Sequence, residues 1–443
     1  MTVSTDRVSV LDASNLRVEK YGLPMHMAGL VILDAGPLLD PSGALRLAAI
    51  SAHIEERTRS ASRLRQVLAF PRRGRPMWVG SEDLDITHHV RTRALPPPAD
   101  EATLLAACAE LNEVPLDRSR PLWEIWLLTG MAGNRIGMLI RLHHVVADGM
   151  AALDMLAPLF EVADSGHPAP PPVEDEWREP QTFGHRFVSA LRRGTQLVGL
   201  LPARIRQLGQ LLQQTRSPRL SLNQPVGPHH RLTLVRADLA AAKAVAHAHG
   251  GKVNDVVLAA VGGGTRRLLE SRGELPPDLS INVSLAASIR RKHDPRSSGN
   301  RVAIRVVRVP ADEPDSIRQL DQIVAETTAQ RRLPPYQPSG LLLQRWMVRV
   351  MNHQRLVNLL VSNLPGPPAR LTFAGAPVLE MFQVGLVQGN LAISVGVLSY
   401  AGQLTFNVVS DADVIPDVHF FADGVAQTLR DLGAIRAQGS ESA

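Results

Sequence analysis

The sequence lacks features that mark several classes of protein. It has one cysteine, Cys108, among 443 residues. That count excludes an intrachain disulfide framework and a cysteine-type zinc module, and it fits a reducing compartment. No apolar run approaches the roughly 18 residues that cross a bilayer, and residues 1–12 lack the apolar core of a signal peptide. We therefore expect a cytoplasmic chain that spans no membrane.

Acidic residues are missing from one long interval. None occurs between Glu179 and Asp238, and nine arginines lie there: Arg186, Arg192, Arg193, Arg204, Arg206, Arg216, Arg219, Arg231 and Arg236. Removing these nine charges from the formal net charge of +6 leaves the rest of the chain at −3. A localised cationic segment argues against a general nucleic-acid surface and indicates one local anionic partner.

The interval predicts two amphipathic helices, about 182–201 and 203–214, which Pro202 separates. Two interpretations stay open. In one, the pair bridges two units and keeps its arginines in water. In the other it lies on an anionic membrane or lipid-droplet surface, with Arg192, Arg193, Arg204 and Arg206 in contact with it. The second makes the protein a peripheral membrane protein.

The composition of the chain is typical of a globular protein. Hydrophobic residues make up 44% and charged residues 20%, and the length suggests two or three compact units. A proline-rich stretch, 165–180, reads as an exposed linker. Strand-like and helix-like runs interleave on both sides of it, which predicts two α/β units. We expect an N-terminal domain (1–164), a linker with basic helices (165–230) and a C-terminal domain (231–443).

The expected elements come from hydrophobic periodicity. Strands are predicted at Met27–Leu33, Arg135–Leu142, Leu279–Val283, Val302–Val309, Leu391–Val397 and Gln403–Val409. Helices are predicted at Leu45–Leu68, Glu101–Leu111, Asp238–His249, Asp255–Leu269, Ile317–Gln330 and Val418–Leu432. Gly262–Gly264 is no phosphate loop, because it lies in a helix and lacks a following Lys and Ser or Thr.

The segment 141–149 (RLHHVVADG) carries the strongest chemical signal. It comes after a predicted strand and precedes a helix near Met150. Neighbouring strand residues face opposite sides, so one of His143 and His144 can face a cavity while the other packs. Asp148 is suited to anchoring the turn, and Gly149 supplies the conformational freedom that the turn needs.

Two other histidine pairs serve as internal controls. His88-His89 and His229-His230 are not followed by Asp-Gly at this spacing, so we interpret them as structural or surface residues. His143 and His144 diverge, and no third ligand lies nearby in the sequence, so we expect no metal. We expect no cofactor either.

Several blocks together resemble the bacterial wax ester synthase/diacylglycerol acyltransferase family, within the coenzyme A-dependent acyltransferase superfamily. They occur in order along nearly the whole chain: Leu11-Asp12 through Leu16 with Pro24-Met25-His26, Pro115-Leu116-Asp117 leading into Pro121-Leu122-Trp123, His143-His144-x-x-x-Asp148-Gly149, Asn254-Asp255, Gly299-Asn300, Val361–Pro367 and the stretch 389–411. Two positions depart from the family pattern. Ala286 stands where an arginine is usual, for which Arg290 or Arg291 is a candidate replacement, and Asn15 stands where a bulky aromatic is common.

The resemblance implies a two-domain, chloramphenicol-acetyltransferase-like α/β fold. Each domain has a mixed sheet with flanking helices, and the active site lies at the domain interface. It implies direct transfer of a long-chain acyl group from acyl-CoA to diacylglycerol or a long-chain alcohol. His144 is then the general base, His143 and Asp148 support the turn, and Gly149 N–H or Asn254 is a candidate oxyanion donor.

The remaining blocks have structural interpretations beside the functional one. Asn254 and Asp255 either cap a helix or shape the site. Pro121-Leu122-Trp123 is expected to be structural. Val361–Pro367, which includes Ser362 and Asn363, is predicted to form a turn in the second domain that lines the cleft. No Gly-x-Ser-x-Gly elbow occurs, and Cys108 lies in an apolar helix, so covalent catalysis lacks a nucleophile.

Two rival functions remain. One is a condensation-type or polyketide-associated acyltransferase that takes acyl groups from a carrier protein. The chain lacks the Asp-Phe-Gly-Trp-Gly block of those enzymes. The other is a catalytically silent lipid-surface protein, which the departure at Ala286 favours and the intact His144–Gly149 segment opposes.

Overall fold

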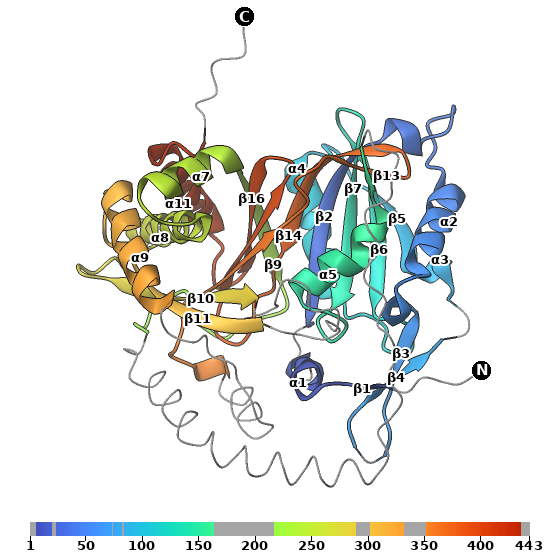
Figure 1. Cartoon of the computed structure of the whole chain (residues 1–443), viewed down its shortest axis with the longest axis horizontal. Helices are drawn as coiled ribbons and strands as arrows, with labels where there is room; N and C mark the ends of the chain where they lie inside the picture. Colours follow the sequence, from blue (N-terminus) through green and yellow to red (C-terminus); the bar gives the residue numbers. More distant parts are fainter. Residues whose placement is uncertain are drawn as a thin grey trace, which may run out of the picture.

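The computed structural model describes residues 6–19, 24–72, 74–81, 84–163, 217–288, 302–331 and 351–435. They form two α/β lobes, each built on one large mixed sheet (Figure 1). The predicted fold class is confirmed. The predicted linker falls mostly outside the described residues.

The first lobe contains a seven-stranded sheet in the order β5-β6-β7-β2-β14-β13-β8. Its strands are β2 (His26–Asp34), β5 (Val90–Ala94), β6 (Trp123–Met131), β7 (Arg135–His143), β8 (Glu161–Val162), β13 (Leu371–Phe373) and β14 (Ala376–Val384). A three-stranded sheet, β1-β4-β3, packs beside it, formed by β1 (Asp6–Arg7), β3 (Gln66–Ala69) and β4 (Met77–Gly80).

The helices of the first lobe are α1 (Val10–Val18), α2 (Leu47–Thr58), α3 (Ile86–His89), α4 (Glu101–Glu113) and α5 (Gly149–Leu156). Short 3-10 turns lie at η2 (Gly36–Leu38), η3 (Ser62–Arg65) and η4 (Ala157–Leu159). Successive residues of β2 join different cores, with Leu30 and Ile32 in one and Val31 and Leu33 in the other. The large sheet is therefore covered on both faces, which explains why β2 and β7 are almost uniformly apolar.

The second lobe contains a six-stranded sheet in the order β11-β10-β12-β15-β16-β9. Its strands are β9 (His230–Asp238), β10 (Ser280–Ser288), β11 (Val302–Pro310), β12 (Leu359–Pro365), β15 (Ile393–Tyr400) and β16 (Gln403–Asp411). Its helices are α7 (Leu239–Ala248), α8 (Val253–Ser271), α9 (Ser316–Arg331) and α11 (Val418–Asp431), with a 3-10 turn, η5 (Met351–His353).

Glycines set the spacing between α8 and α11. A Cβ on Gly263 would lie 1.9 Å from Thr428 Oγ1, and one on Gly424 would lie 2.5 Å from the Gly263 carbonyl oxygen. Only residues without side chains allow so close a crossing. The glycine run 262–264 is thus a helix-packing feature.

The two lobes share strands and ion pairs. Strands β13 and β14 come late in the chain but belong to the sheet of the first lobe, where β14 pairs with β2. Arg236 on β9 bonds Glu380 on β14 at 2.8 Å and also pairs with Glu101 on α4. The lobes therefore share an interface, where a Cβ on Gly149, the first residue of α5, would lie 2.9 Å from the Leu364 side chain on β12.

The helix predicted over Leu45–Leu68 is wrong in its second half. Helix α2 ends at Thr58, and residues 66–69 form strand β3. Leu68 pairs with Trp78 of β4, and both side chains are buried. Pairing with a strand that comes later in the chain overrides the local periodicity here.

Candidate active site

The histidine pair lies where β7 ends. His143 is the last residue of the strand and pairs with His26 of β2, and residues 144–146 form a turn. The His143 N–H donates to the Leu122 carbonyl at 3.1 Å, and the His144 N–H donates to the Met25 carbonyl at 2.8 Å. The backbone of both histidines is therefore fixed by neighbouring segments.

His143 is held by its own turn and by a carboxylate. Its Nδ1 accepts from the Val145 N–H at 2.9 Å, so a neutral ring carries its proton on Nε2. That nitrogen lies 3.3 Å from Glu19 Oε1. The ring thus bridges the turn and Glu19, a geometry that suits a supporting role.

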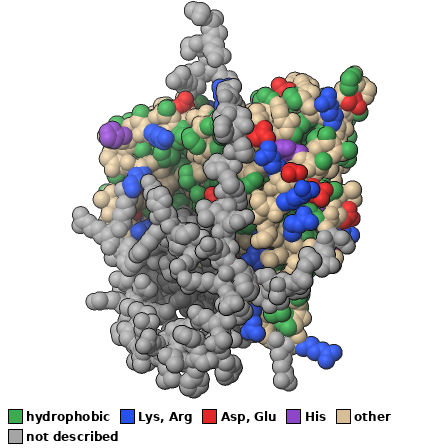
Figure 2. Space-filling model, turned by 45° about the vertical axis from the view of Figure 1, so that its right-hand side comes forward, with side chains coloured by type: hydrophobic (Ala, Val, Ile, Leu, Met, Phe, Trp, Pro, Cys, Tyr) green, Lys and Arg blue, Asp and Glu red, His purple; other side chains and the backbone are tan. Residues whose placement is uncertain are grey.

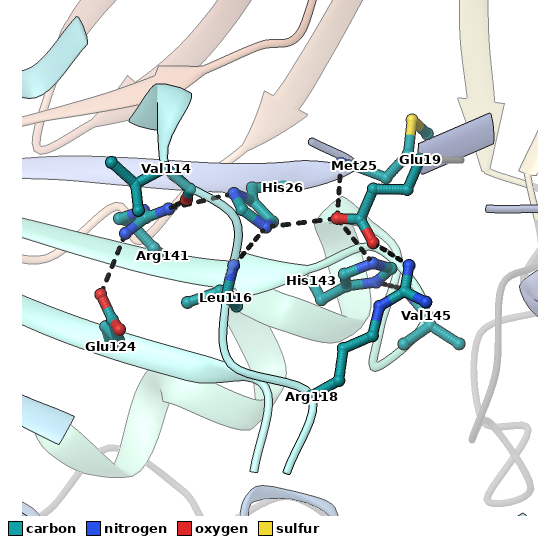
Figure 3. A network of polar contacts seen from close by, with 10 residues as sticks. All are labelled: Glu19, Met25, His26, Val114, Leu116, Arg118, Glu124, Arg141, His143 and Val145. Carbon is teal, nitrogen blue, oxygen red and sulfur yellow. Dashed lines mark hydrogen bonds and ion pairs between the residues drawn. The ribbon is translucent and has the colours of Figure 1, made fainter. Parts of the chain in front are cut away.

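Glu19 is the centre of a buried polar network (Figure 3). Besides His143, it accepts from the Met25 N–H at 3.3 Å, pairs with Arg118 and lies 3.6 Å from His26 Nε2. Burial alone would raise its pKa, but the hydrogen bond and charge of His143, followed by those of Arg118, lower the pKa to about 2. Glu19 is therefore a carboxylate at neutral pH.

A second buried polar cluster links strands β2, β6 and β7. Arg141 donates to Glu124 at 2.9 Å and contacts His26 Nδ1 at 3.1 Å, and all three side chains are buried (Figure 3). Burial, followed by the charge of Arg141, lowers the pKa of His26 to about 3. His26 is therefore neutral, and its ring lies between the guanidinium of Arg141 and the carboxylate of Glu19.

His144 lies in the turn and is half-buried. Its carbonyl oxygen accepts from Asn15 Nδ2 at 3.2 Å. Burial lowers the pKa of His144 to about 4, the charge of His143 acts in the same direction, and Asp148 opposes both. The imidazole is neutral at physiological pH and can accept a proton.

Sequence reasoning missed Glu19 and the contact of Asn15 with His144. The available signal was their spacing. Residues four apart on a helix share one face, so Asn15 and Glu19 reach the histidine turn from the same side of the N-terminal segment. Nothing local in the sequence shows which turn that face meets.

Asp148 and Gly149 begin helix α5. Asp148 is buried and is the N-cap, with its Oδ1 accepting from the Ala151 N–H at 2.9 Å. Gly149 does not have the left-handed φ that would call for the conformational freedom predicted for it. Instead, a Cβ at this position would lie 2.9 Å from the Leu364 side chain on β12. The position therefore favours glycine because an added side chain would displace the end of Leu364, and not because of backbone freedom.

The Pro121-Leu122-Trp123 block supports the end of β7. The Leu122 carbonyl accepts from the His143 N–H. Trp123 is buried, donates from Nε1 to the Leu64 carbonyl at 2.8 Å and stacks on His89 at 4.3 Å. These contacts are structural.

Asn254 and Asp255 have different environments. Asp255 is buried, accepts from the Lys252 N–H at 2.7 Å and from Thr327 Oγ1 at 2.8 Å, and so caps α8. Asn254 Oδ1 instead accepts from Asn363 Nδ2 at 2.6 Å. The capping interpretation therefore fits Asp255, whereas Asn254 faces β12.

Ser362 and Asn363 lie on strand β12, where they pair with β15, so the turn predicted for them is wrong. The end of this strand connects the predicted blocks. Leu364 contacts Gly149, Asn363 contacts Asn254, and Ser362 Oγ lies 2.9 Å from the side-chain amide of Gln383 on β14. Residues from three distant parts of the sequence thus meet at the lobe interface, beside the turn that carries His144.

Other predicted residues lie outside the described part of the chain. They include Arg192, Arg193, Arg204, Arg206, Arg290 and Arg291. Among the residues that the structure describes, no cluster of His, Cys, Asp or Glu could hold a metal ion, and no helix is long and apolar enough to cross a membrane. Cys108 is buried in α4, and burial raises its pKa to about 12.

The chain is similar in sequence to one family along most of its length. Residues 8–257 match the family model described as wax ester synthase/diacylglycerol acyltransferase catalytic domain, and residues 298–433 match its C-terminal domain. A Mycobacterium tuberculosis protein named as a putative diacylglycerol O-acyltransferase is 29% identical, covering 96% of this chain and 90% of that protein. Another from the same species is 30% identical and covers 79% of each.

Solved structures are similar in fold. The wax ester synthase/diacylglycerol acyltransferase from Marinobacter aquaeolei VT8 superposes with a TM-score of 0.72 at 24% identity, covering 96% of this chain and 98% of that one. The first condensation domain of the calcium-dependent antibiotic synthetase gives a TM-score of 0.66 at 15% identity, covering 97% and 96%. At these identities the likeness establishes the two-lobed fold alone.

Proposed function

Because the chain belongs to the wax ester synthase/diacylglycerol acyltransferase family, it is an acyltransferase, and we propose that His144 is its general base. The acyl group comes from a long-chain acyl-CoA, and the acceptor is diacylglycerol or a long-chain alcohol. The observation that carries this proposal is the state of His144. Its imidazole is neutral and half-buried, and its backbone N–H and carbonyl are both hydrogen-bonded to neighbouring segments.

The chemistry needs one proton carrier. An alcohol is a poor nucleophile at neutral pH, so His144 takes the hydroxyl proton as the oxygen attacks the thioester carbon. The tetrahedral intermediate then expels the thiolate of coenzyme A, and the same imidazole returns the proton to that sulfur. Gly149 N–H and Asn254 are the candidate donors to the oxyanion.

Neighbouring charges support this cycle. While it holds the proton, His144 is an imidazolium, and the nearby carboxylate of Asp148 favours that form. Covalent catalysis by the cysteine is disfavoured, because Cys108 is buried and its thiol stays protonated at a pKa of about 12. Direct transfer within a ternary complex is therefore the simpler route.

Peripheral membrane association is part of the proposal. Both classes of acceptor dissolve in a bilayer or a lipid droplet, so the enzyme must reach such a surface from the cytoplasm. Arg192, Arg193, Arg204 and Arg206 are the sequence-based candidates for contact with anionic headgroups.

An acceptor and donor panel tests the proposed function. Purified protein is assayed with palmitoyl-CoA against dioleoylglycerol and hexadecanol, with release of free coenzyme A as the readout. We expect turnover with at least one lipid alcohol, and release that depends on neither would overturn the proposal. A parallel assay replaces palmitoyl-CoA with a palmitoylated carrier protein, because condensation domains share this fold. Faster turnover from the carrier would favour the rival function.

A further inference from the structure

The β3–β4 hairpin projects from the lower edge of the first lobe in Figure 1. Its base is firmly anchored. Leu68 and Trp78 pair across the two strands and are buried in the core, and the Arg63 guanidinium lies over the Trp78 ring at 4.6 Å. The described residues of the connecting loop, 70–72 and 74–76, are therefore joined to two anchored strands.

An aromatic side chain is exposed on that loop. Phe70 is 55% exposed, and it is the one aromatic among the four large hydrophobic residues that stand exposed on the described surface. A single exposed apolar side chain is ordinary. Phe70 differs from the other three exposed residues because arginines cluster around it in the sequence.

The hairpin is part of a second acid-free interval. Residues 57–81 contain no Asp or Glu and seven arginines: Arg57, Arg59, Arg63, Arg65, Arg72, Arg73 and Arg75. Three of the four arginines before the hairpin form ion pairs: Arg57, Arg59 and Arg63 pair with Glu161, Glu56 and Asp6. In contrast, Arg72 and Arg75 on the loop form no ion pair with any described residue. The lowest described part of the surface in Figure 2 shows Lys or Arg and hydrophobic side chains.

We propose that Phe70, Arg72 and Arg75, on the described part of the hairpin loop, dock on an anionic lipid surface, with Phe70 inserted among the lipids and the two arginines on headgroup phosphates. This inference rests on the proposed function, whose acceptors reside in such surfaces. An aromatic ring flanked by guanidinium groups is the chemistry of interfacial anchoring. A loop of seven residues is too small for the roughly 1,200 Å² that a stable protein interface buries.

Vesicle flotation of the full chain tests the docking surface. We expect binding to vesicles of phosphatidylcholine with phosphatidylglycerol, and weaker binding to phosphatidylcholine alone or at high salt. Phe70→Ser and the double variant Arg72→Glu/Arg75→Glu should each weaken binding about tenfold. The matched controls lie on the second lobe: Ile317→Ser, at a side chain 48% exposed, and Arg308→Glu/Arg430→Glu, at two exposed arginines.

A site-specific probe reports insertion directly. Cys108 is buried and unreactive, so a nitrobenzoxadiazole label introduced through Phe70→Cys marks the loop alone. Anionic vesicles should shift its emission to the blue, and the same label at Ile317→Cys should not respond. Equal responses at the two sites, or vesicle binding that the loop variants leave unchanged, would overturn the proposal.

Activity assays separate this inference from the proposed function. Phe70→Ser should slow acylation of dioleoylglycerol in vesicles and leave acylation of a water-soluble alcohol unchanged. If the wild-type chain acylates no alcohol, the proposed function fails, while flotation and emission still decide whether the loop binds lipid.

Discussion

The first lobe contains two histidine pairs, and they differ in the elements that they connect. His88-His89 ends the short helix α3 and runs directly into strand β5, whereas His143-His144 ends a strand and enters a turn and a capped helix. Both pairs contact the start of β6. Trp123 stacks on His89, and the Leu122 carbonyl accepts from the His143 N–H.

The direction of the pKa shift does not distinguish the pairs, because burial lowers the pKa of both His89 and His144. The difference is in the surroundings. His89 is fully buried against Trp123, whereas His144 is half-buried on a turn whose helix touches β12 of the second lobe. A neutral histidine therefore becomes a candidate base through its position at the lobe interface.

Removing the imidazole of His144 should have the largest effect. We expect His144→Ala to lower kcat roughly 10²- to 10⁴-fold, the usual contribution of a positioned base. The wild-type and variant proteins should have matching circular dichroism and unfolding midpoints. His88→Ala is the control from the other pair and should keep its turnover. Comparable losses in the two variants would remove the distinction between the pairs.

Neutralising Glu19 should have the next largest effect. Its folded pKa of about 2 lies below the ordinary value of 4.5, so the carboxylate contributes stability that is present above pH 4.5 and is lost as the pH falls toward 2. The shift corresponds to about 3 kcal/mol. We expect Glu19→Gln to lower the free energy of unfolding by up to about that amount at pH 7, and by much less near pH 2.

Urea unfolding at several pH values measures this difference. Glu161→Gln is the control, because Glu161 pairs with Arg57 at a partly exposed site and should contribute at most about 1 kcal/mol. Turnover of Glu19→Gln should also fall, since His143 loses its charged partner. Wild-type and variant stability curves that stay parallel across pH would contradict the assigned role of Glu19.

Much of the histidine turn was predictable from sequence because its signals are local. An apolar strand, a histidine pair and an Asp-Gly helix start are contiguous, so 136–150 indicates strand, turn and helix without tertiary information. Glu19 was not predictable in this way. Its partners His143 and Arg118 are remote in the chain, and only the packing of the N-terminal segment brings them together.

The same distinction explains the other differences. The helix predicted to Leu68 ends at Thr58, because β3 finds a partner in β4. A conformational reason was predicted for the glycine at position 149, and the structure gives a steric reason instead. That reason is a contact with Leu364 on a strand that the sequence pattern does not place next to α5. Local sequence patterns predict which helices and strands form, whereas long-range contacts determine the roles of particular residues within them.

Filling the space at Gly149 should have an intermediate effect. The added methyl of Gly149→Ala meets Leu364, so we expect a loss of about 1.5 kcal/mol in stability and reduced turnover, because α5 carries the turn with it. Adding Leu364→Ala should recover part of the activity in a double-mutant cycle. If the two substitutions are simply additive, the contact does not explain the glycine.

Substituting the buried member of the other pair should have the smallest effect on turnover. His89→Phe keeps a ring that can stack on Trp123 but removes the hydrogen bond between His89 Nδ1 and the Trp123 carbonyl, which is 2.7 Å long. We expect a loss of about 1 kcal/mol in the free energy of unfolding, because the carbonyl oxygen loses that partner. The kcat should be unchanged, since the adjacent Leu122 carbonyl still holds His143. A fall in kcat larger than the loss of folded protein explains would show that a change at His89 reaches His143 through the start of β6. The two histidine pairs would then form one site.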